Sequence, residues 1–265
     1  MGLRIAPCGA GTARSHRHRL RRGAAGEPQD RLSHGHRFPA CGRRHRVSES
    51  LLRGVRAHER DTARFLTSVA QDSSRADFWE TRYRDQVTPW DAGRIGERLQ
   101  RYAREMKPGA RVLIPGCGSG HEAGFLAEAG FDVLAIDFSP AAVEAARKNL
   151  GRCAGRVQLA DFFAFDAGAP FDVMIERAFL CALPRKMWAD YAVRTSELLT
   201  PDGVIAGYWF FDDNPKGPPF GTSEAELQAL LGTRFKRIVD EPVTDSIPVF
   251  QDRERWQVWA RRPAT

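Results

Sequence analysis

The chain has 265 residues, 42% of them hydrophobic, which is enough to bury one full core and compatible with one or two domains. No apolar run approaches the roughly 18–20 residues that a membrane helix needs, so we expect no membrane partner. The net charge of +7 is uneven. Residues 1–60 hold 14 of the 40 Lys and Arg but only four of the 33 acidic residues, so this leader carries +10 and residues 61–265 carry −3. Nucleic-acid binding would therefore depend on the leader alone, and we expect no such partner.

Residues 1–60 are predicted to be a disordered basic leader. They contain six of the seven histidines, many glycines and prolines, and no lasting helical or alternating period. A solvated tail, or an upstream extension without a function, is the simplest interpretation, and the alternatives are a transit peptide and a metal- or nucleic-acid-binding tract. The histidine and cysteine spacing matches no zinc template, so we expect no metal. Five cysteines without a CxxC pair or a secretion signal predict a cytoplasmic protein.

Readable periodicity begins near residue 77. Residues 76–86 and 94–106 have helical spacing, with the loop VTPWDAG between them. Strands and helices then alternate. The predicted strands are 111–116, 132–137, 157–161, 171–176 and 203–211, and the helices are 121–130, 139–151, 185–199 (stopped by Pro201) and 223–232.

The chain ends differently, with two alternating runs at 234–243 and 255–262 and no helical pattern between them. Strands that alternate with helices favour right-handed crossovers and a parallel sheet, whereas the last two runs are typical of an antiparallel pair. The sequence therefore predicts an α/β fold, with a doubly wound, mainly parallel seven-stranded sheet that ends in an antiparallel strand pair.

A glycine-rich turn follows the first strand. Gly116, Gly118 and Gly120 permit positive φ and close approach of a ligand to the main chain. Asp137, at the end of the second strand, is placed to accept hydrogen bonds from the two hydroxyls of a ribose. The spacing is G-x-G-x-G with His121 in sixth place, unlike the dinucleotide fingerprint G-x-G-x-x-G, and no P-loop lysine follows. This favours S-adenosylmethionine over a nicotinamide cofactor or a nucleoside triphosphate.

Two residues after the third strand support this ligand. Asp161 could accept a hydrogen bond from the adenine amino group, with Phe162 against the ring. The alternatives are a NAD-linked oxidoreductase, a noncatalytic S-adenosylmethionine-binding module, and a glycine turn that serves packing alone. We assign Cys117 and His121, inside the glycine turn, to loop packing rather than catalysis.

Six segments together resemble the thiopurine S-methyltransferase family, including its thiol and halide branch: FWETRYRDQVTPWDAG, LIPGCGSGHEA, AIDFSPAAV, ADFFAF, FDVMIERAFLCAL and GPPFG. The resemblance covers about residues 77–262. It implies a Rossmann-like class I S-adenosylmethionine-dependent methyltransferase that methylates the sulfur of a small thiol by in-line displacement. Methylation of halide, thiocyanate or hydrosulfide is the alternative. We expect a monomer, with residues 61–108 as a helical cap covering the cofactor and 109–265 as the methyltransferase domain.

The resemblance also implies roles for individual residues. Aromatic side chains of the cap fold over the cofactor, and further contacts come from the strand ends; the matching positions are Trp79, Tyr83, Trp90, Gly116, Asp137, Asp161, Phe162 and Arg177. Arg177 is also expected near the acceptor, where it would favour an anionic form. The predicted substrate-side residues are Trp90, Pro218, Pro219 and Phe220. We assign no dedicated base, because a thiol with a pKa near 8.5 ionises sufficiently by itself at neutral pH.

Overall fold

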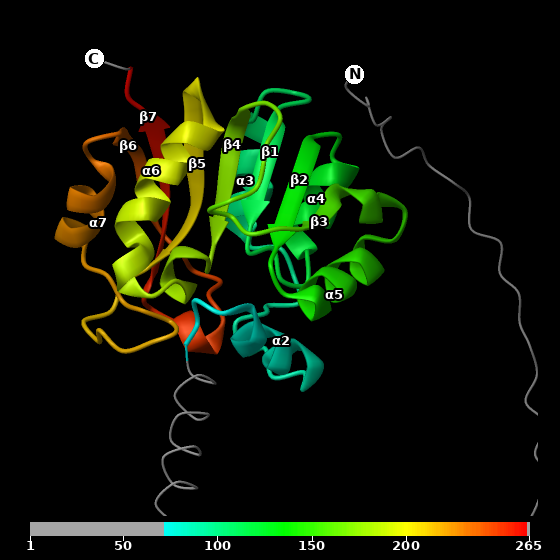
Figure 1. Cartoon of the computed structure of the whole chain (residues 1–265). Coiled ribbons are helices and arrows are strands. Elements are labelled where there is room, and N and C mark those ends of the chain that lie inside the picture. The colour runs from blue at the N-terminus through cyan, green and yellow to red at the C-terminus, as the bar shows by residue number, and fades with distance from the viewer. Residues whose placement is uncertain (1–71, 264–265) are drawn as a thin grey trace, which may run out of the picture. The chain divides into compact units, whose positions relative to one another are not determined.

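The computed structural model describes residues 72–263, so the predictions made for the leader lie outside the described residues. Its centre is a seven-stranded sheet in the order β3-β2-β1-β4-β5-β7-β6 (Figure 1). The strands are β1 (Arg111–Pro115), β2 (Asp132–Asp137), β3 (Val157–Leu159), β4 (Phe171–Arg177), β5 (Leu199–Phe210), β6 (Phe235–Pro242) and β7 (Glu254–Arg261). Strands β1 to β5 are parallel, and β7 runs antiparallel to both β5 and β6. The predicted sheet, with its antiparallel C-terminal pair, is confirmed.

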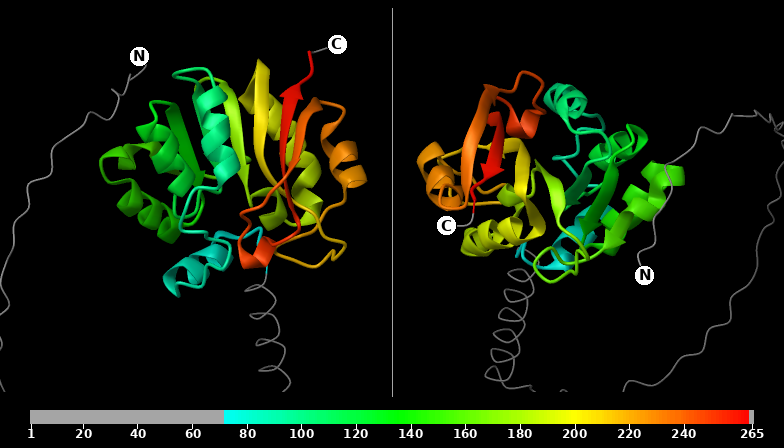
Figure 2. Two further views of the ribbon diagram at one scale, coloured as in Figure 1. Left: turned by 180° about the vertical axis from the view of Figure 1, so that it is seen from behind. Right: turned by 90° about the horizontal axis from the view of Figure 1, so that it is seen from above.

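Helices cover both faces of the sheet. They are α2 (Ala76–Arg84), α3 (Glu97–Glu105), α4 (His121–Glu128), α5 (Pro140–Leu150), α6 (Trp188–Leu198) and α7 (Glu224–Leu231). Short 3-10 turns are η1 (Gly151–Arg156), η2 (Leu180–Ala182), η3 (Arg185–Met187) and η4 (Pro248–Phe250). Figures 1 and 2 show α6 and α7 on one face and α3 on the opposite face.

Each face has its own apolar core, because successive side chains of a strand point to opposite sides. On β1, Val112 and Ile114 pack in the cluster that includes residues of α3, α4 and α5. Leu113, between them, packs in the other cluster with residues of α6 and α7. Helix α5 begins as its sequence predicts, with the Ser139 hydroxyl accepting the Ala142 N–H at 3.2 Å. No helix among residues 72–263 combines the length and apolar character needed to cross a membrane.

The predicted boundary between the helix at 185–199 and the strand at 203–211 was wrong. Helix α6 ends at Leu198 and β5 begins directly at Leu199, so Pro201 lies inside the strand instead of separating helix from strand. The register explains why a proline is tolerated there. Phe171 pairs with Leu199 but Val173 with Val204, so the intervening residues bulge out of the ladder. Pro201 lies in that exposed bulge, where the missing N–H removes no ladder hydrogen bond.

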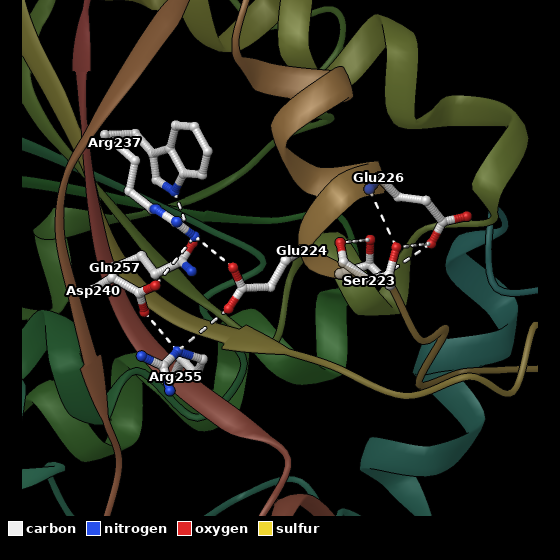
Figure 3. Close-up of polar contacts among 9 residues, drawn as sticks. Ser223, Glu224, Glu226, Arg237, Asp240, Arg255 and Gln257 are labelled. Carbon is white, nitrogen blue, oxygen red and sulfur yellow. Dashed lines mark hydrogen bonds and ion pairs between the residues drawn. The ribbon is translucent and has the colours of Figure 1, made fainter.

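The C-terminal edge of the sheet carries a network of ion pairs (Figure 3). Arg237 of β6 pairs with Glu224 of α7 and with Asp240, each at 3.1 Å. Arg255 of β7 contacts the other oxygen of Asp240 at 2.6 Å and Glu224 at 3.8 Å. Glu226 completes a capping box at the start of α7. The network joins α7 to both strands of the antiparallel pair.

Candidate active site

The order of the strands reverses between β1 and β4, and a large cavity opens at their carboxyl ends. Together with the open solvent at its mouth, it has an empty volume of about 1240 Å³. Turns that follow β1, β2, β3 and β4 line it, together with the segment around α2. All ten residues predicted to bind the cofactor lie along its wall: Trp79, Tyr83, Trp90, Gly116, Gly118, Gly120, Asp137, Asp161, Phe162 and Arg177. Open α/β sheets bind their ligands at such a reversal.

The glycine turn leaves no room for side chains. Gly116 has φ +56° and Gly118 has φ +51°, both in the left-handed region. A Cβ at Gly116 would lie 2.5 Å from the Phe179 ring, and one at Gly118 would lie 2.4 Å from the Tyr83 hydroxyl. The absence of side chains therefore allows two aromatic residues to close on the main chain.

Asp137 is the buried acid at the end of β2. Its carboxylate oxygens accept the N–H of Gly118 at 3.0 Å and the N–H of Ser139 at 2.9 Å. Burial raises the pKa of the Asp137 carboxyl, while these two hydrogen bonds favour its ionised form. A carboxylate has about four acceptor positions, and backbone donors of Gly118, Phe138 and Ser139 take up to three of them. The arrangement can therefore fix the glycine turn and still accept a hydrogen bond from a ligand hydroxyl.

The β3 side of the cavity combines one acid with packed aromatic rings. Asp161 is exposed, and one of its oxygens accepts the Phe163 N–H at 2.9 Å, which leaves the other for a ligand. Phe162 is buried and packs against Phe179 with ring centroids 5.1 Å apart. Phe163 and Phe179 also line the cavity, although the sequence did not single them out.

The cap contributes a cluster of three aromatic rings. Trp90 packs edge-on against Trp79, with centroids 5.3 Å apart, and its Nε1 donates to the Tyr83 hydroxyl at 3.3 Å. Helix α2 is fastened to the start of α5 by Glu80, whose Oε2 accepts from the Ser139 hydroxyl and the Ala141 N–H, both at 2.8 Å. Figure 1 shows α2 beside α5. One carboxylate thus holds the helix that carries two of the three rings.

Arg177 lines the cavity, but its charge is already matched. Its Nη1 pairs with Glu254 Oε1 at 2.6 Å, and its guanidinium stacks 4.4 Å from the centroid of the Tyr208 ring. Both side chains of the pair are largely buried, at 15% and 3% exposure. The expected role of Arg177 near the acceptor stays a prediction, and the structure adds its ion pair with Glu254, a residue 77 positions away that the sequence did not single out.

The turn after β4 is strained and held by a buried acid. Ala178 has φ +57°, a conformation that non-glycine residues rarely adopt. Glu176 Oε1 accepts the N–H of Phe179 at 2.8 Å and of Leu180 at 3.1 Å, and its Oε2 accepts the Tyr191 hydroxyl at 2.9 Å. Burial raises the pKa of Glu176, whereas these donors favour the carboxylate. The acid sets the position of the Phe179 ring over the glycine turn.

A polar pair joins the VTPWDAG loop to the glycine turn. His121 Nε2 lies 3.1 Å from Asp91 Oδ1, and both residues line the cavity. The hydrogen bond to Asp91 raises the pKa of His121, and the same contact holds the pKa of Asp91 well below its usual range. His121 therefore joins cap to core in addition to packing in the loop. In the sequence, the signals that could have predicted this pair were the acid of the TPWDAG segment, Asp91, and the histidine of the GHEA segment, His121.

The GPPFG loop is not brought to this cavity. Pro218, Pro219 and Phe220, predicted on the substrate side, are absent from its described lining. The Phe220 N–H instead donates to the Cys181 carbonyl at 2.7 Å, and the ring packs against the α6–α7 core. Leu183 and Met187 contribute apolar lining that the sequence did not indicate.

Comparisons with known proteins agree on one family. The model of the thiopurine S-methyltransferase (TPMT) family matches residues 74–262. Thiocyanate methyltransferase 1 of Brassica oleracea is 27% identical over 208 residues, which are 76% of this chain and 90% of that protein. Thiopurine S-methyltransferase of Bordetella parapertussis is 32% identical over 201 residues, 67% of this chain and 92% of that protein.

Among solved structures, the chain is similar to 1,6-didemethyltoxoflavin-N1-methyltransferase of Burkholderia thailandensis, which was crystallised with S-adenosylhomocysteine. The TM-score is 0.55 at 22% identity, covering 71% of this chain and 87% of that chain. At this identity the similarity concerns the fold, which is that of class I S-adenosylmethionine-dependent methyltransferases.

Proposed function

The chain belongs to the thiopurine S-methyltransferase family, and on that premise we propose that it methylates a small, largely apolar thiol. It is an S-adenosylmethionine-dependent S-methyltransferase, and the proposal concerns the molecule that accepts the methyl group. The observation that carries the proposal is the pairing of every basic side chain on the described cavity wall. Arg94 pairs with Asp245 at 2.8 Å, His121 with Asp91, and Arg177 with Glu254.

This pairing favours thiols over inorganic anions. A halide or thiocyanate ion that leaves water needs a counter-charge or several hydrogen-bond donors. The basic groups of the wall are already neutralised, and the same wall includes the apolar side chains of Trp90, Phe179, Leu183 and Met187. Such a surface suits the carbon skeleton of a thiol.

The residues present fit the methyl donor. Asp137 is buried at the cavity wall with acceptor capacity left over, which suits the ribose of S-adenosylmethionine. We propose that Asp161 and Phe162 bind the adenine, that the glycine turn approaches the rest of the donor, and that the cap segment, residues 61–108, covers it. When bound, the donor supplies a methyl group already activated by positive charge on its sulfur.

The chain's own contribution is alignment and exclusion of water. Faces of aromatic rings attract cations by about 0.5–2 kcal/mol, so Trp79, Tyr83 and Trp90 can stabilise the positive charge of the donor. When these three rings cover the cavity they exclude water from the site, which strengthens their attraction for the cation. Because free thiols ionise near pH 8.5, alignment suffices without a dedicated base.

We further propose a cytoplasmic monomer that works without nucleic acid. The net charge of −3 on residues 61–265 supports the last point, because a surface of that sign gains nothing from phosphates. Light scattering during gel filtration tests the oligomeric state, and a dimer would contradict this part.

A substrate panel tests the acceptor. The full chain is assayed with methyl-labelled donor and an aromatic thiol, a thiopurine, an aliphatic thiol, hydrosulfide, thiocyanate and iodide. We expect kcat/KM for at least one organic thiol to exceed that for thiocyanate and iodide by about tenfold or more, a difference of about 1.4 kcal/mol. Preference for an inorganic anion would overturn the proposal and favour the anion-methylating alternative.

A further inference from the structure

Four carboxylates line the described wall of the cavity, and three of them have defined tasks. Asp91 is bound to His121, Asp137 holds the glycine turn, and Asp161 closes its own turn at the end of β3. The fourth, Glu122, is the second residue of α4. It enters none of the steps derived above.

The Glu122 carboxyl has no ionic partner among the described residues. Its neighbouring cations, His121 and Arg177, are each paired with another acid, at 3.1 and 2.6 Å. The donor that reaches it is the backbone N–H of Glu122 itself, in the first turn of α4. Burial raises the pKa of Glu122, while Arg177 opposes that rise through space. Glu122 is partly exposed, on the cavity wall. A bound ligand would take its carboxylate out of water without a partner, which is costly, and a ligand cation would offset that cost.

The position of Glu122 indicates which part of the donor it meets. The nucleoside sites proposed above lie at the ends of β2 and β3. Glu122 instead follows the turn after β1, and its electrostatic neighbours are His121, Asp91, Cys117, Arg177 at the end of β4 and Tyr208 of β5. In the strand order β3-β2-β1-β4, Glu122 belongs to the β1 and β4 side of the cavity, whereas the proposed nucleoside sites belong to the β2 and β3 side. A methyl donor that binds across these strand ends, with its nucleoside at β2 and β3, would direct its amino-acid end toward Glu122.

We propose that Glu122 is the counter-ion of the α-ammonium group of the methyl donor. This inference rests on the proposed placement of the nucleoside at Asp137 and Asp161. The charges match: the donor brings a cation that has to leave water, and Glu122 is the carboxylate of the described wall that accepts neither an ion pair nor a hydrogen bond from another residue. The first turn of α4 adds its own stabilisation of a negative charge.

A role in removing the acceptor proton fits less well. A carboxylic acid is a much stronger acid than a thiol, so a carboxylate is a poor acceptor for the proton that the thiol loses, and the thiol needs no strong base. The two roles differ in what they predict, because an ammonium partner acts on binding of the donor whereas a base acts on the rate as a function of pH.

The test compares two nucleosides on the full chain. S-Adenosylhomocysteine carries the amino-acid end, and 5′-methylthioadenosine lacks it. Glu122→Gln keeps the size and loses the charge. We expect about 10- to 100-fold weaker binding of S-adenosylhomocysteine by calorimetry, and 5′-methylthioadenosine bound within about twofold of wild type. The matched control is Glu128→Gln in the same helix, whose side chain is 63% exposed and should leave both affinities unchanged.

Three results would overturn the inference. The first is unchanged affinity of Glu122→Gln for S-adenosylhomocysteine, and the second is an equal loss for both nucleosides, which would mean general damage to the cavity. The third is a normal KM for the donor with a kcat that recovers as pH rises, which marks a proton acceptor. If wild type bound neither nucleoside, the proposed nucleoside site would itself fail, which is distinguishable because it concerns the unmodified chain.

Discussion

The cavity has a sheet side and a cap side, and they are held in place by different kinds of contact. On the sheet side, backbone N–H groups bind buried acids: Asp137 fixes the turn after β1, and Glu176 fixes the turn after β4. On the cap side, ring edges meet, and the polar contacts that hold α2 and the VTPWDAG loop to the core include those of Glu80 and the Asp91–His121 pair. The sheet side therefore depends on backbone hydrogen bonds to buried acids, whereas α2 and this loop depend on side-chain contacts.

The largest effect is expected on the sheet side, for Asp137→Ala. The change removes the proposed ribose acceptor and also leaves the Gly118 and Ser139 N–H groups without their partner. We expect S-adenosylhomocysteine to bind about 100-fold more weakly or worse, since hydrogen bonds to charged groups contribute about 1.5–3 kcal/mol each. Calorimetry measures this. Asp132→Ala, at the exposed start of the same strand, is the control, and an equal loss there would refute the assignment.

A smaller effect is expected on the cap side, for Glu80→Gln. The neutral amide weakens the contacts with the Ser139 hydroxyl and the Ala141 N–H, so the closed position of α2 becomes less populated. We expect KM for the methyl donor to rise about 3- to 10-fold with kcat little changed, because the hydrogen bonds keep part of their strength. Asp77→Asn, exposed on the same helix, provides the control. A drop in kcat with unchanged KM would show that Glu80 does not govern closure.

The pH dependence of the cap contact is smaller still. The pKa of His121 is raised in the folded state. Protonated His121 therefore contributes its full stabilisation of the fold below pH 6.5, the ordinary pKa of histidine, and this stabilisation is lost as the pH rises through the raised value. The pKa of Asp91 is lowered in the folded state. Ionised Asp91 therefore contributes its full stabilisation above pH 3.8, the ordinary pKa of aspartate, and this stabilisation is lost as the pH falls through the lowered value. The pair is therefore strongest between these limits. We expect His121→Gln to lower the Tm relative to wild type more at pH 6 than at pH 9. A difference that grew toward pH 9 would contradict the pairing.

The smallest effect is expected far from both walls, in the network of Figure 3. The side chains of Glu224, Arg237 and Arg255 are 54%, 30% and 36% exposed. Exposed pairs contribute about 0–1 kcal/mol, so Glu224→Gln should lower the free energy of unfolding by about 1 kcal/mol at most and leave kcat/KM unchanged. Urea unfolding and the standard assay check this. A loss of activity would mean that the C-terminal edge communicates with the cavity.

The sequence predicted what local patterns determine. Alternating strands and helices, the glycine turn and the acid after β2 are short-range signals, and the fold and the family they indicated are confirmed. What was missed depends on distant partners. The pairing of Arg177 with Glu254 joins residues 77 apart, and the bulge at Pro201 depends on the register with β4. The GPPFG loop was predicted on the substrate side from its place after the fifth strand, whereas the hydrogen bond from the Phe220 N–H holds it to the core beside η2.

The most direct test of the account is to follow the methyl group itself. The full chain is incubated with S-adenosylmethionine carrying a ¹³C-methyl group and with the best thiol of the panel, and products are identified by NMR. We predict one S-methyl thioether for each S-adenosylhomocysteine formed, and no product with Asp137→Ala. A methyl group on nitrogen or oxygen, or the absence of any thioether from an active, folded wild-type chain, would contradict the account.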